Sequence, residues 1–134
     1  MKKAFTLIEL LIVISIIGIL LSITSFSYLT AQKKGRDSRR RQDLKAIQTA
    51  LEQYYTENGV YPTGTAIDSA FNNNQRPQDP KNTGTYVYNW NYLTADAYCV
   101  CAKLEATTGN ADAPTSSTCT WNSSGSYLCI QNQQ

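Results

Sequence analysis

The N-terminal part of the chain is dominated by one long apolar segment. Residues 5–21 are apolar except for Thr6, Glu9 and Ser15, less apolar residues continue the segment to Leu29, and the 20 residues from Leu10 to Leu29 contain no charged side chain. A helix of that length spans roughly 30 Å, which is the thickness of the hydrocarbon core of a bilayer. The segment therefore predicts a helix that is able to cross a membrane.

A basic run separates this apolar segment from an amphipathic one. Residues 33–45 carry seven basic and two acidic side chains. After them, apolar residues recur at helical spacing, which predicts one buried helix face made of Leu44, Ile47, Leu51, Tyr54 and Tyr55. Gly59 and Pro62 supply a stop signal. We therefore expect one helix over about residues 5–58, weakened at Gly35, because glycine within a helix costs about 1 kcal/mol relative to alanine.

The pattern changes to a period of two in the C-terminal part. Residues 63–85 are rich in Asn, Gly, Thr and Pro and predict a loop with one short turn near residues 66–71. Alternating residues over 86–93 and 98–104 predict two strands joined by a tight turn. A last strand is expected over 127–131, with residues 118–122 pairing beside it. Packing this small antiparallel sheet against the amphipathic helix face gives an α+β fold.

These patterns divide the chain into four segments. Residues 1–4 form a short basic start, and residues 5–31 form the membrane-spanning part of the helix. Residues 32–62 form its amphipathic second half with the turn that follows. Residues 63–134 form a small head that contains the sheet. A head of this size has a small hydrophobic core that gives marginal stability, and such small domains are often stabilised by disulfides.

The four cysteines of the chain all lie in this head. Cys99 and Cys101 are two residues apart on one strand face, where their Cα atoms are about 6.5–7 Å apart, at or beyond the usual limit for a disulfide. Each is therefore expected to bond to one of Cys119 and Cys129, with the pairing left open. A four-cysteine zinc site is the alternative, but the Cys-x-Cys spacing differs from the usual Cys-x₂₋₄-Cys. We favour disulfides, and with them an oxidising compartment.

Composition argues against catalysis. The chain has 12 basic and 10 acidic side chains and no histidine, so the commonest general base and metal ligand is missing. The sequence offers no phosphate-cradling glycine loop and no base to activate a serine or cysteine nucleophile. We therefore expect no enzyme activity, no catalytic residue, no cofactor and no metal.

Glu9 is the one charged residue within the apolar segment. A carboxylate costs of order 2.5–3.5 kcal/mol at the centre of a membrane helix and less near its end. One interpretation places the side chain in the interface, where it reaches water. The other is that Glu9 awaits a positively charged partner in an assembly.

The first half of the chain resembles a known family. The stretch KKAFTLIELLIVISIIGIL is similar to the prepilin leader and N-terminal segment of type IV pilins and type II secretion pseudopilins. Residues 43–63, DLKAIQTALEQYYTENGVYPT, also resemble the major pseudopilin and competence pilins. The resemblance implies cleavage between Ala4 and Phe5 by a prepilin peptidase, N-methylation of Phe5, and an assembly role for Glu9. A neighbouring copy's new amine at Phe5 would neutralise that carboxylate.

The resemblance also implies partners and a location. The precursor would sit in the inner membrane as a single-pass protein with its head outside, and an inner-membrane assembly platform would draw it into a cell-surface filament. The filament would contain copies of the chain itself or sister pilins. Gly18 matches a glycine of the family and, with Gly35, is a candidate point of helix flexibility.

Three features depart from the family pattern. Ala4 stands where the family usually has glycine, although alanine is small enough for cleavage. The helix lacks the proline that many pilins carry near the place of Phe26. The head also lacks a clustered acidic loop for calcium, because its carboxylates are scattered, as at Asp96, Glu105 and Asp112.

Several alternatives remain open from sequence alone. Residues 1–31 could be an ordinary secretory signal cut near Ala31, but the apolar stretch is longer than the usual 7–15 residues. The positive-inside rule, counted over residues 33–41, would place the head in the cytoplasm, whereas the cysteines and the resemblance place it outside. The runner-up functions are a pseudopilin of a type II secretion fibre and a membrane-anchored binding module.

The basic run itself has two interpretations. The first is a solvated helix face, offset by acids on neighbouring turns or subunits: Asp37, Asp43, Glu52 and Glu57. The second is a surface that binds nucleic acid or lipid phosphates. No aromatic side chain interleaves the run to stack on bases, so the support for nucleic acid is weak.

Overall fold

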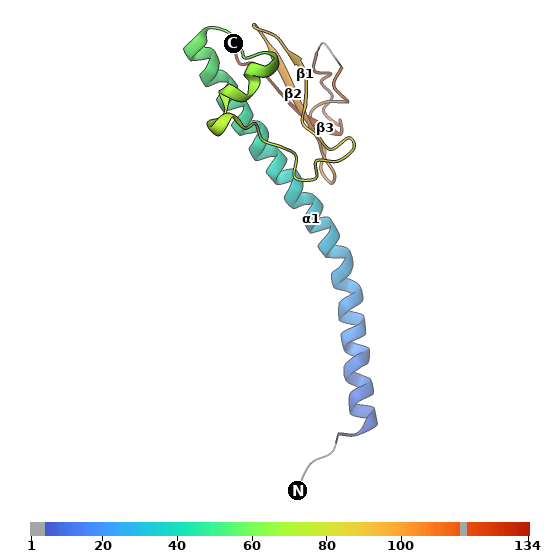
Figure 1. Ribbon diagram of the computed structural model, residues 1–134. Coiled ribbons are helices and arrows are strands. Elements are labelled where there is room, and N and C mark those ends of the chain that lie inside the picture. The colour runs from blue at the N-terminus through green and yellow to red at the C-terminus, as the bar shows by residue number, and fades with distance from the viewer. Residues whose placement is uncertain (1–4, 116–117) are drawn as a thin grey trace. The chain divides into compact units, whose positions relative to one another are not determined.

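The computed structural model describes residues 5–115 and 118–134. The chain contains one long helix, two short 3₁₀ helices and a three-stranded sheet (Figure 1). Their bounds are α1 Leu7–Asn58, η1 Gly64–Ala70, η2 Asn72–Asn74, β1 Asn89–Leu93, β2 Tyr98–Lys103 and β3 Tyr127–Gln131. The chain divides into two compact units, Met1–Lys33 and Lys34–Gln134. The predicted cleavage position at Ala4 lies outside the described residues.

Helix α1 confirms the single long helix expected from the two apolar patterns. It is helical through both Gly18 and Gly35, and the flexibility predicted at these glycines stays a prediction. It ends at Asn58, where Gly59 adopts a left-handed conformation with a φ of 72°. The amide of Gly59 donates to the carbonyl of Tyr55 at 2.7 Å, which satisfies one of the open carbonyls at the helix end.

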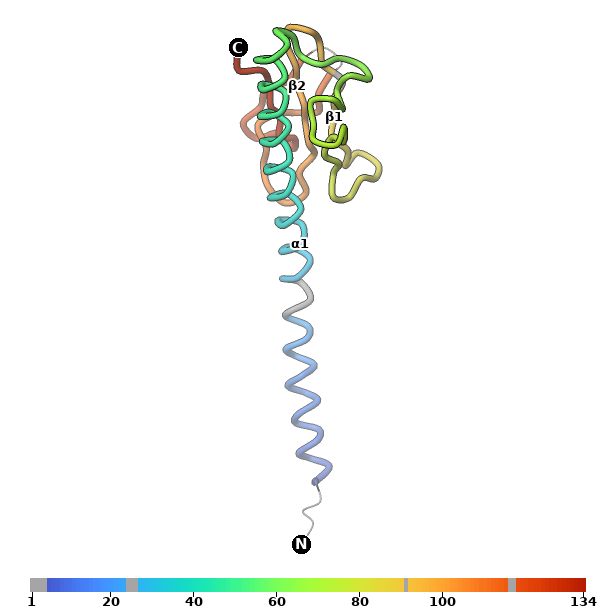
Figure 2. Tube along the Cα trace, turned by 60° about the vertical axis from the view of Figure 1, so that its left-hand side comes forward, coloured from blue at the N-terminus to red at the C-terminus, as the bar shows by residue number. Residues whose placement is uncertain are grey.

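The sheet of the second unit is antiparallel with the order β1-β2-β3, so β2 is its central strand. The segment of α1 after Lys34 runs beside the sheet in both views (Figures 1 and 2). The core between helix and sheet is formed by apolar side chains from both layers: Leu44, Ile47, Leu51, Tyr98, Val100 and Ala102. This packing confirms the expected two-layer α+β fold.

Strand β1 is shorter than its alternating sequence predicted. It begins at Asn89 and not at residue 86, because the chain makes a tight turn that pairs Thr83 with Tyr86. The register is also irregular, since Asn89 faces Cys101 while Tyr92 faces Cys99. Three steps along β1 therefore match two along β2, as in a bulge.

The bulge reverses the side-chain alternation of β1. Tyr88 and Trp90 pack in the core against the helix, whereas Tyr92 lies with the cysteines on the other face and Leu93 with the core. Trp90 and Tyr92, although two residues apart, therefore lie on opposite faces of the sheet. A shift of one residue in the register of a strand moves the following side chains to the opposite face of the sheet. The alternation of apolar and polar residues in the sequence does not show where such a shift occurs.

The second face of the sheet is covered by the chain between β2 and β3. Ala111 forms bridges to both Trp121 and Tyr127, so residues 118–122 pair with the 109–112 segment and not directly with β3 as expected. A Cβ at Gly109 would collide with the backbone of Tyr127, and one at Gly125 with that of Ala111. Both positions therefore need glycine for this close approach.

Candidate functional site

The first turn of α1 holds Glu9 in a capping box. The backbone amide of Thr6 donates to a Glu9 carboxylate oxygen at 2.9 Å, and the Thr6 hydroxyl donates to the same oxygen at 2.7 Å. The amide of Glu9 in turn donates to the Thr6 hydroxyl oxygen at 3.3 Å. The Thr-x-x-Glu spacing is the signature of this motif. Glu9 therefore has a local role, in starting the helix, that sequence reasoning missed although the signal was present.

The surface around Glu9 is apolar and uncovered. Phe5 is 85% exposed, and large aliphatic side chains on all sides of the helix are more than 45% exposed: Leu7, Ile8, Leu10, Leu11, Ile12, Val13, Ile14, Ile16 and Ile17. This stretch is long and apolar enough to cross a membrane, and none of its apolar window is buried within the chain. So large an apolar surface requires lipid or other protein to cover it.

The second unit contains a buried charge network that sequence reasoning missed. The guanidinium of Arg40 is fully buried and makes ion pairs with three carboxylates, at 2.6 Å to Asp79 and at 2.8 Å to both Asp37 and Glu105. Arg36 adds a bidentate pair with Glu105 at 2.7 Å. The network joins the helix to the loops that precede β1 and follow β2, at sequence separations of 39 and 65 residues.

Asp37 is the most heavily bonded acid of this network. Its carboxylate accepts the backbone amides of Glu105, Ala106 and Thr107 at 2.8–3.2 Å, besides the pair with Arg40. Burial opposes ionisation, but these donors outweigh it and hold the pKa of Asp37 below its usual value. The bidentate hydrogen bond from Arg36 is the main cause that lowers the pKa of Glu105 to about 2.

This network corrects one interpretation of the basic run. The prediction of a wholly solvated helix face was wrong for Asp37 and Arg40, which are 1% and 0% exposed. The i,i+3 spacing of the two was visible in sequence, but their partners Asp79 and Glu105 lie far away along the chain. Lys34, Arg39 and Arg41 remain exposed, as a solvated face requires.

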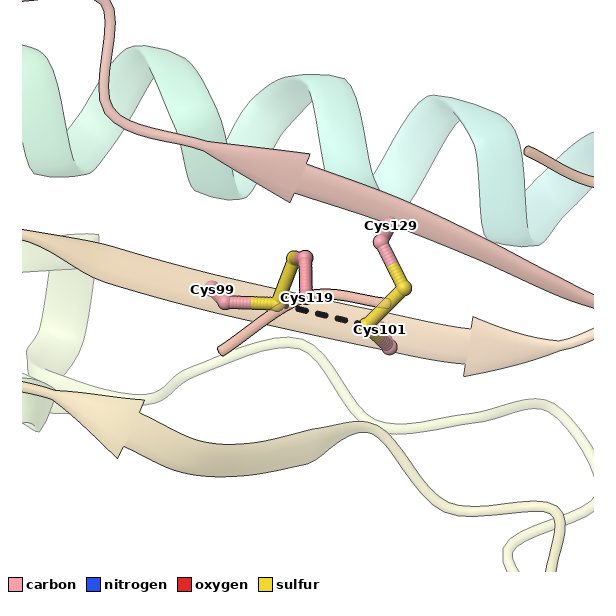
Figure 3. Close-up of side chains that lie close together, drawn as sticks. All are labelled: Cys99, Cys101, Cys119 and Cys129. Carbon is pink, nitrogen blue, oxygen red and sulfur yellow. Dashed lines mark hydrogen bonds between the residues drawn. A yellow bond between two sulfur atoms is a disulfide. The ribbon is translucent and has the colours of Figure 1, made fainter. Parts of the chain in front are cut away.

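The cysteines form two disulfides on the sheet face away from α1. Cys99 is bonded to Cys119 and Cys101 to Cys129, which confirms that each strand cysteine pairs with one of the other two (Figure 3). The four sulfur atoms all lie within 4.8 Å of one another, and the Sγ atoms of Cys99 and Cys101 are 3.5 Å apart. This set would suit a soft metal ion only when reduced, because the thiolate is the ligand and each sulfur here is bonded to another.

Comparison with known proteins assigns the N-terminal segment. Residues 1–25 match the family described as the prokaryotic N-terminal methylation motif. The chain is also similar to known pilins. A type IV major pilin protein PilA from Myxococcus xanthus is 39% identical over 60 residues, which cover 45% of this chain and 27% of that protein.

Further relatives extend this pilin-like match. The type II secretion system core protein G of Vibrio cholerae is 36% identical over 62 residues, covering 46% of this chain and 42% of the relative. The fimbrial protein EcpB of Eikenella corrodens is 36% identical over 75 residues, covering 56% and 47%. The match thus spans less than half the length of each of these relatives. No solved structure matches the chain.

The site residues predicted from sequence are therefore distributed over both units. Phe5 and Glu9 lie at the exposed start of α1, and Gly18 lies within its apolar stretch, where an added Cβ would meet no neighbouring group within 4 Å. Gly35 and the four cysteines belong to the second unit. The segment that matches the methylation motif thus contains the candidate assembly residues, and the head contains both disulfides.

Proposed function

We propose that the chain is a structural subunit of a type IV pilus or a related extracellular filament, assembled through its apolar N-terminal helix. The observation that carries the proposal is the methylation-motif match over residues 1–25, on a helix whose apolar side chains are uncovered on every side. Such a helix is stable either in lipid or among copies of itself. The proposal assigns the chain no reaction and no cofactor.

In this proposal, a prepilin peptidase cleaves between Ala4 and Phe5 and the new amine of Phe5 is methylated. That amine is positively charged below a pKa of about 7.7–8.0. In the filament it neutralises Glu9 of a neighbouring copy, in place of the hydroxyl and amide of Thr6 that Glu9 binds in the single chain. A buried pair adds little stability but is costly to break, so it favours one register between subunits.

The precursor is proposed to reside in the inner membrane, with its head outside, until an assembly platform extracts it. An oxidising compartment outside the cytoplasm suits the two disulfides of the head. Copies of the chain or sister pilins then bury the apolar surface of α1. The positive-inside rule would keep the basic run in the cytoplasm; in this proposal its exposed cations Lys34, Arg39 and Arg41 lie on the surface of the head.

The test combines processing with assembly. Mass spectrometry of the membrane protein is expected to find a chain that begins with a methylated Phe5. In cells that carry the assembly machinery, the Glu9→Ala variant is expected to be processed but to give few or no filaments, with Glu9→Gln as the isosteric comparison. A chain that begins at residue 32, or normal filaments from Glu9→Ala, would contradict the proposal.

A second candidate is a pseudopilin that forms a short fibre for type II secretion. It is supported by the similarity of the chain to type II secretion system core protein G and by the resemblance of residues 43–63 to the major pseudopilin. Shearing separates the two candidates, since only a long surface pilus is released into the sheared fraction. A membrane-anchored binding module, the third candidate, would leave the processed chain dispersed in the membrane while the assembly machinery is active.

A further inference from the structure

One flank of α1 in the second unit carries an uncompensated row of cations. Lys34, Arg41 and Lys45 are spaced by seven and four residues, which places them on one side of the helix. All three are exposed. We call these three residues the basic flank. Along the helix it extends over about 16 Å, at 1.5 Å per residue.

No carboxylate neutralises the basic flank within the described part of the chain. Arg41 donates to the Thr107 hydroxyl and the Thr108 carbonyl, and the ammonium of Lys45 donates to the side-chain amide of Gln48. The carboxylates nearby are instead bound by Arg36 and Arg40. Arg36 and Arg40 therefore pair with the carboxylates of the head, and the basic flank remains available to bind an external anion.

The same unit provides the complementary charge at its other end. Residues 46–75 contain no lysine or arginine. Glu57 is exposed in the last turn of α1, which has no basic residue, although a carboxylate there opposes the helix dipole by about 0.3–1 kcal/mol. Asp96 is exposed in the turn after β1, and the bond from the Tyr61 amide to the Ala95 carbonyl ties this turn to the chain that follows α1. Glu57 and Asp96 form what we call the acidic end.

We propose that the basic flank of one copy binds the acidic end of a second copy of this chain. The contact rests on the proposed filament function, and it names the polar surfaces by which the heads meet. Along the axis of α1, Glu57 lies roughly 18 Å beyond Lys45 and roughly 35 Å beyond Lys34. A parallel copy displaced by a distance in that range therefore brings opposite charges together.

Such a contact joins two different surfaces of the same chain. Interfaces of this kind do not close on themselves in pairs, and they generate open helical filaments when the rotation does not close a ring. Opposite charges at such surfaces select the register and suppress wrong docking, because like charges placed together cost several kcal/mol. The charge arrangement of the head thus favours polymerisation with one polarity.

The experiment is a charge swap in the full-length chain, expressed in cells that assemble filaments. One variant combines Lys34→Glu with Lys45→Glu, a second combines Glu57→Lys with Asp96→Lys, and a third carries all four substitutions. A control variant, Lys81→Glu with Lys103→Glu, makes the same change in net charge as the first variant at lysines outside the basic flank. Filaments in the sheared fraction are measured relative to processed chain in the membrane.

Each two-residue swap at the contact is expected to lower filament yield about tenfold or more, because it brings like charges together. The fourfold variant is expected to recover most of the yield, and the control to match the wild type. Recovery also shows that the substituted heads fold. The contact is overturned if the two-residue swaps assemble normally, as they would if the flank bound nucleic acid or lipid instead, or if the fourfold variant shows no recovery. Absence of filaments from the wild-type chain would overturn the filament function itself.

Discussion

Arg40 shows at the scale of single residues how one buried charge organises the head. Its guanidinium has no exposure and is surrounded by Asp37, Asp79 and Glu105. Desolvation alone would lower the pKa of Arg40, but the three carboxylates outweigh it and raise that pKa. The side chain therefore stays charged, and each of its partners belongs to a different part of the chain.

Replacing Arg40 by methionine is expected to lower the free energy of unfolding by about 3–5 kcal/mol, because it leaves buried carboxylates without their partner. Denaturant unfolding of the detergent-solubilised chain, followed by tryptophan fluorescence, measures the loss. Arg39→Met is the matched control, since Arg39 is 68% exposed and its Nε lies 3.9 Å from Asp43. Its effect is expected to stay within about 0.5 kcal/mol, and equal losses from the two variants would refute the role of the network.

Glu105 makes the stability of the head depend on pH in the acidic range. Its pKa lies at about 2 in the folded chain, below the ordinary value of 4.5. The unfolded chain therefore binds the proton more readily, and the stabilisation is fully present above pH 4.5 and is lost as the pH falls from 4.5 towards 2. Glu105→Gln is expected to cost about 3 kcal/mol at pH 7 and to flatten the decline below pH 4.5. An unchanged pH profile in this variant would assign the decline to other groups.

Among the secondary-structure elements, strand β2 contributes side chains to both faces of the sheet. Tyr98, Val100 and Ala102 face the helix, while Cys99 and Cys101 face the opposite side. The strand thus connects the apolar core to the disulfides through its alternation alone. The disulfide to Cys119 holds the loop between β2 and β3, where few apolar contacts would, and the disulfide to Cys129 joins the neighbouring strands β2 and β3.

The two disulfides are expected to differ in their resistance to reduction. Cys101 and Cys129 are 0% and 2% exposed, whereas Cys119 is only half-buried. A thiolate must reach a sulfur atom to attack it, so mild reductant is expected to open Cys99–Cys119 first. Alkylation followed by mass spectrometry of partly reduced protein measures the order. Early labelling of Cys101 and Cys129 would contradict this expectation.

Removing either disulfide is expected to destabilise the head by about 2–4 kcal/mol, because each closes a loop of the unfolded chain. The sequence separations are 20 and 28 residues, so the two losses are expected to be similar. Paired alanine substitutions, Cys99→Ala with Cys119→Ala and Cys101→Ala with Cys129→Ala, keep the remaining cysteines paired. Unfolding of the oxidised variants in denaturant gives both values.

The whole molecule combines two units with opposite surface chemistry. The first presents apolar side chains in every direction, and the second buries most of its large apolar residues, with Val60, Val87 and Trp121 exposed. In the proposed function, the first unit exchanges lipid for neighbouring helices and the second remains in water. The basic flank and the acidic end of the second unit then decide how its copies meet.

A charge in the apolar stretch is expected to weaken membrane residence. Ile16→Arg adds about 2.5–3.5 kcal/mol to the cost of insertion at the centre of the span, so less of the chain is expected to resist alkaline extraction of membranes. Thr49→Arg, at an exposed position of the same helix in the second unit, is the control and is expected to behave as the wild type. Equal extraction of both variants would show that the apolar stretch does not anchor the chain.

Much of this architecture was determined by local sequence. The uncharged stretch of 20 residues, the apolar spacing after Leu44 and the stop at Gly59 sufficed to predict α1, because helical periodicity depends on neighbours three and four residues apart. The same holds for the alternation of β2. The cysteine spacing argued against a bond between Cys99 and Cys101, and the first residues of the chain resembled the prepilin leader.

Only the tertiary structure decided which distant groups meet. In it, Cys99 is bonded to Cys119 and Cys101 to Cys129. Arg40, which belongs to the basic run, is buried and forms an ion pair with Asp79. The tertiary structure also placed the bulge that moves Tyr92 to the outer face. The physical reason is that these outcomes depend on pairings between segments tens of residues apart. Such pairings are fixed by the shared packing of helix, sheet and loops, and no local period in the sequence records them.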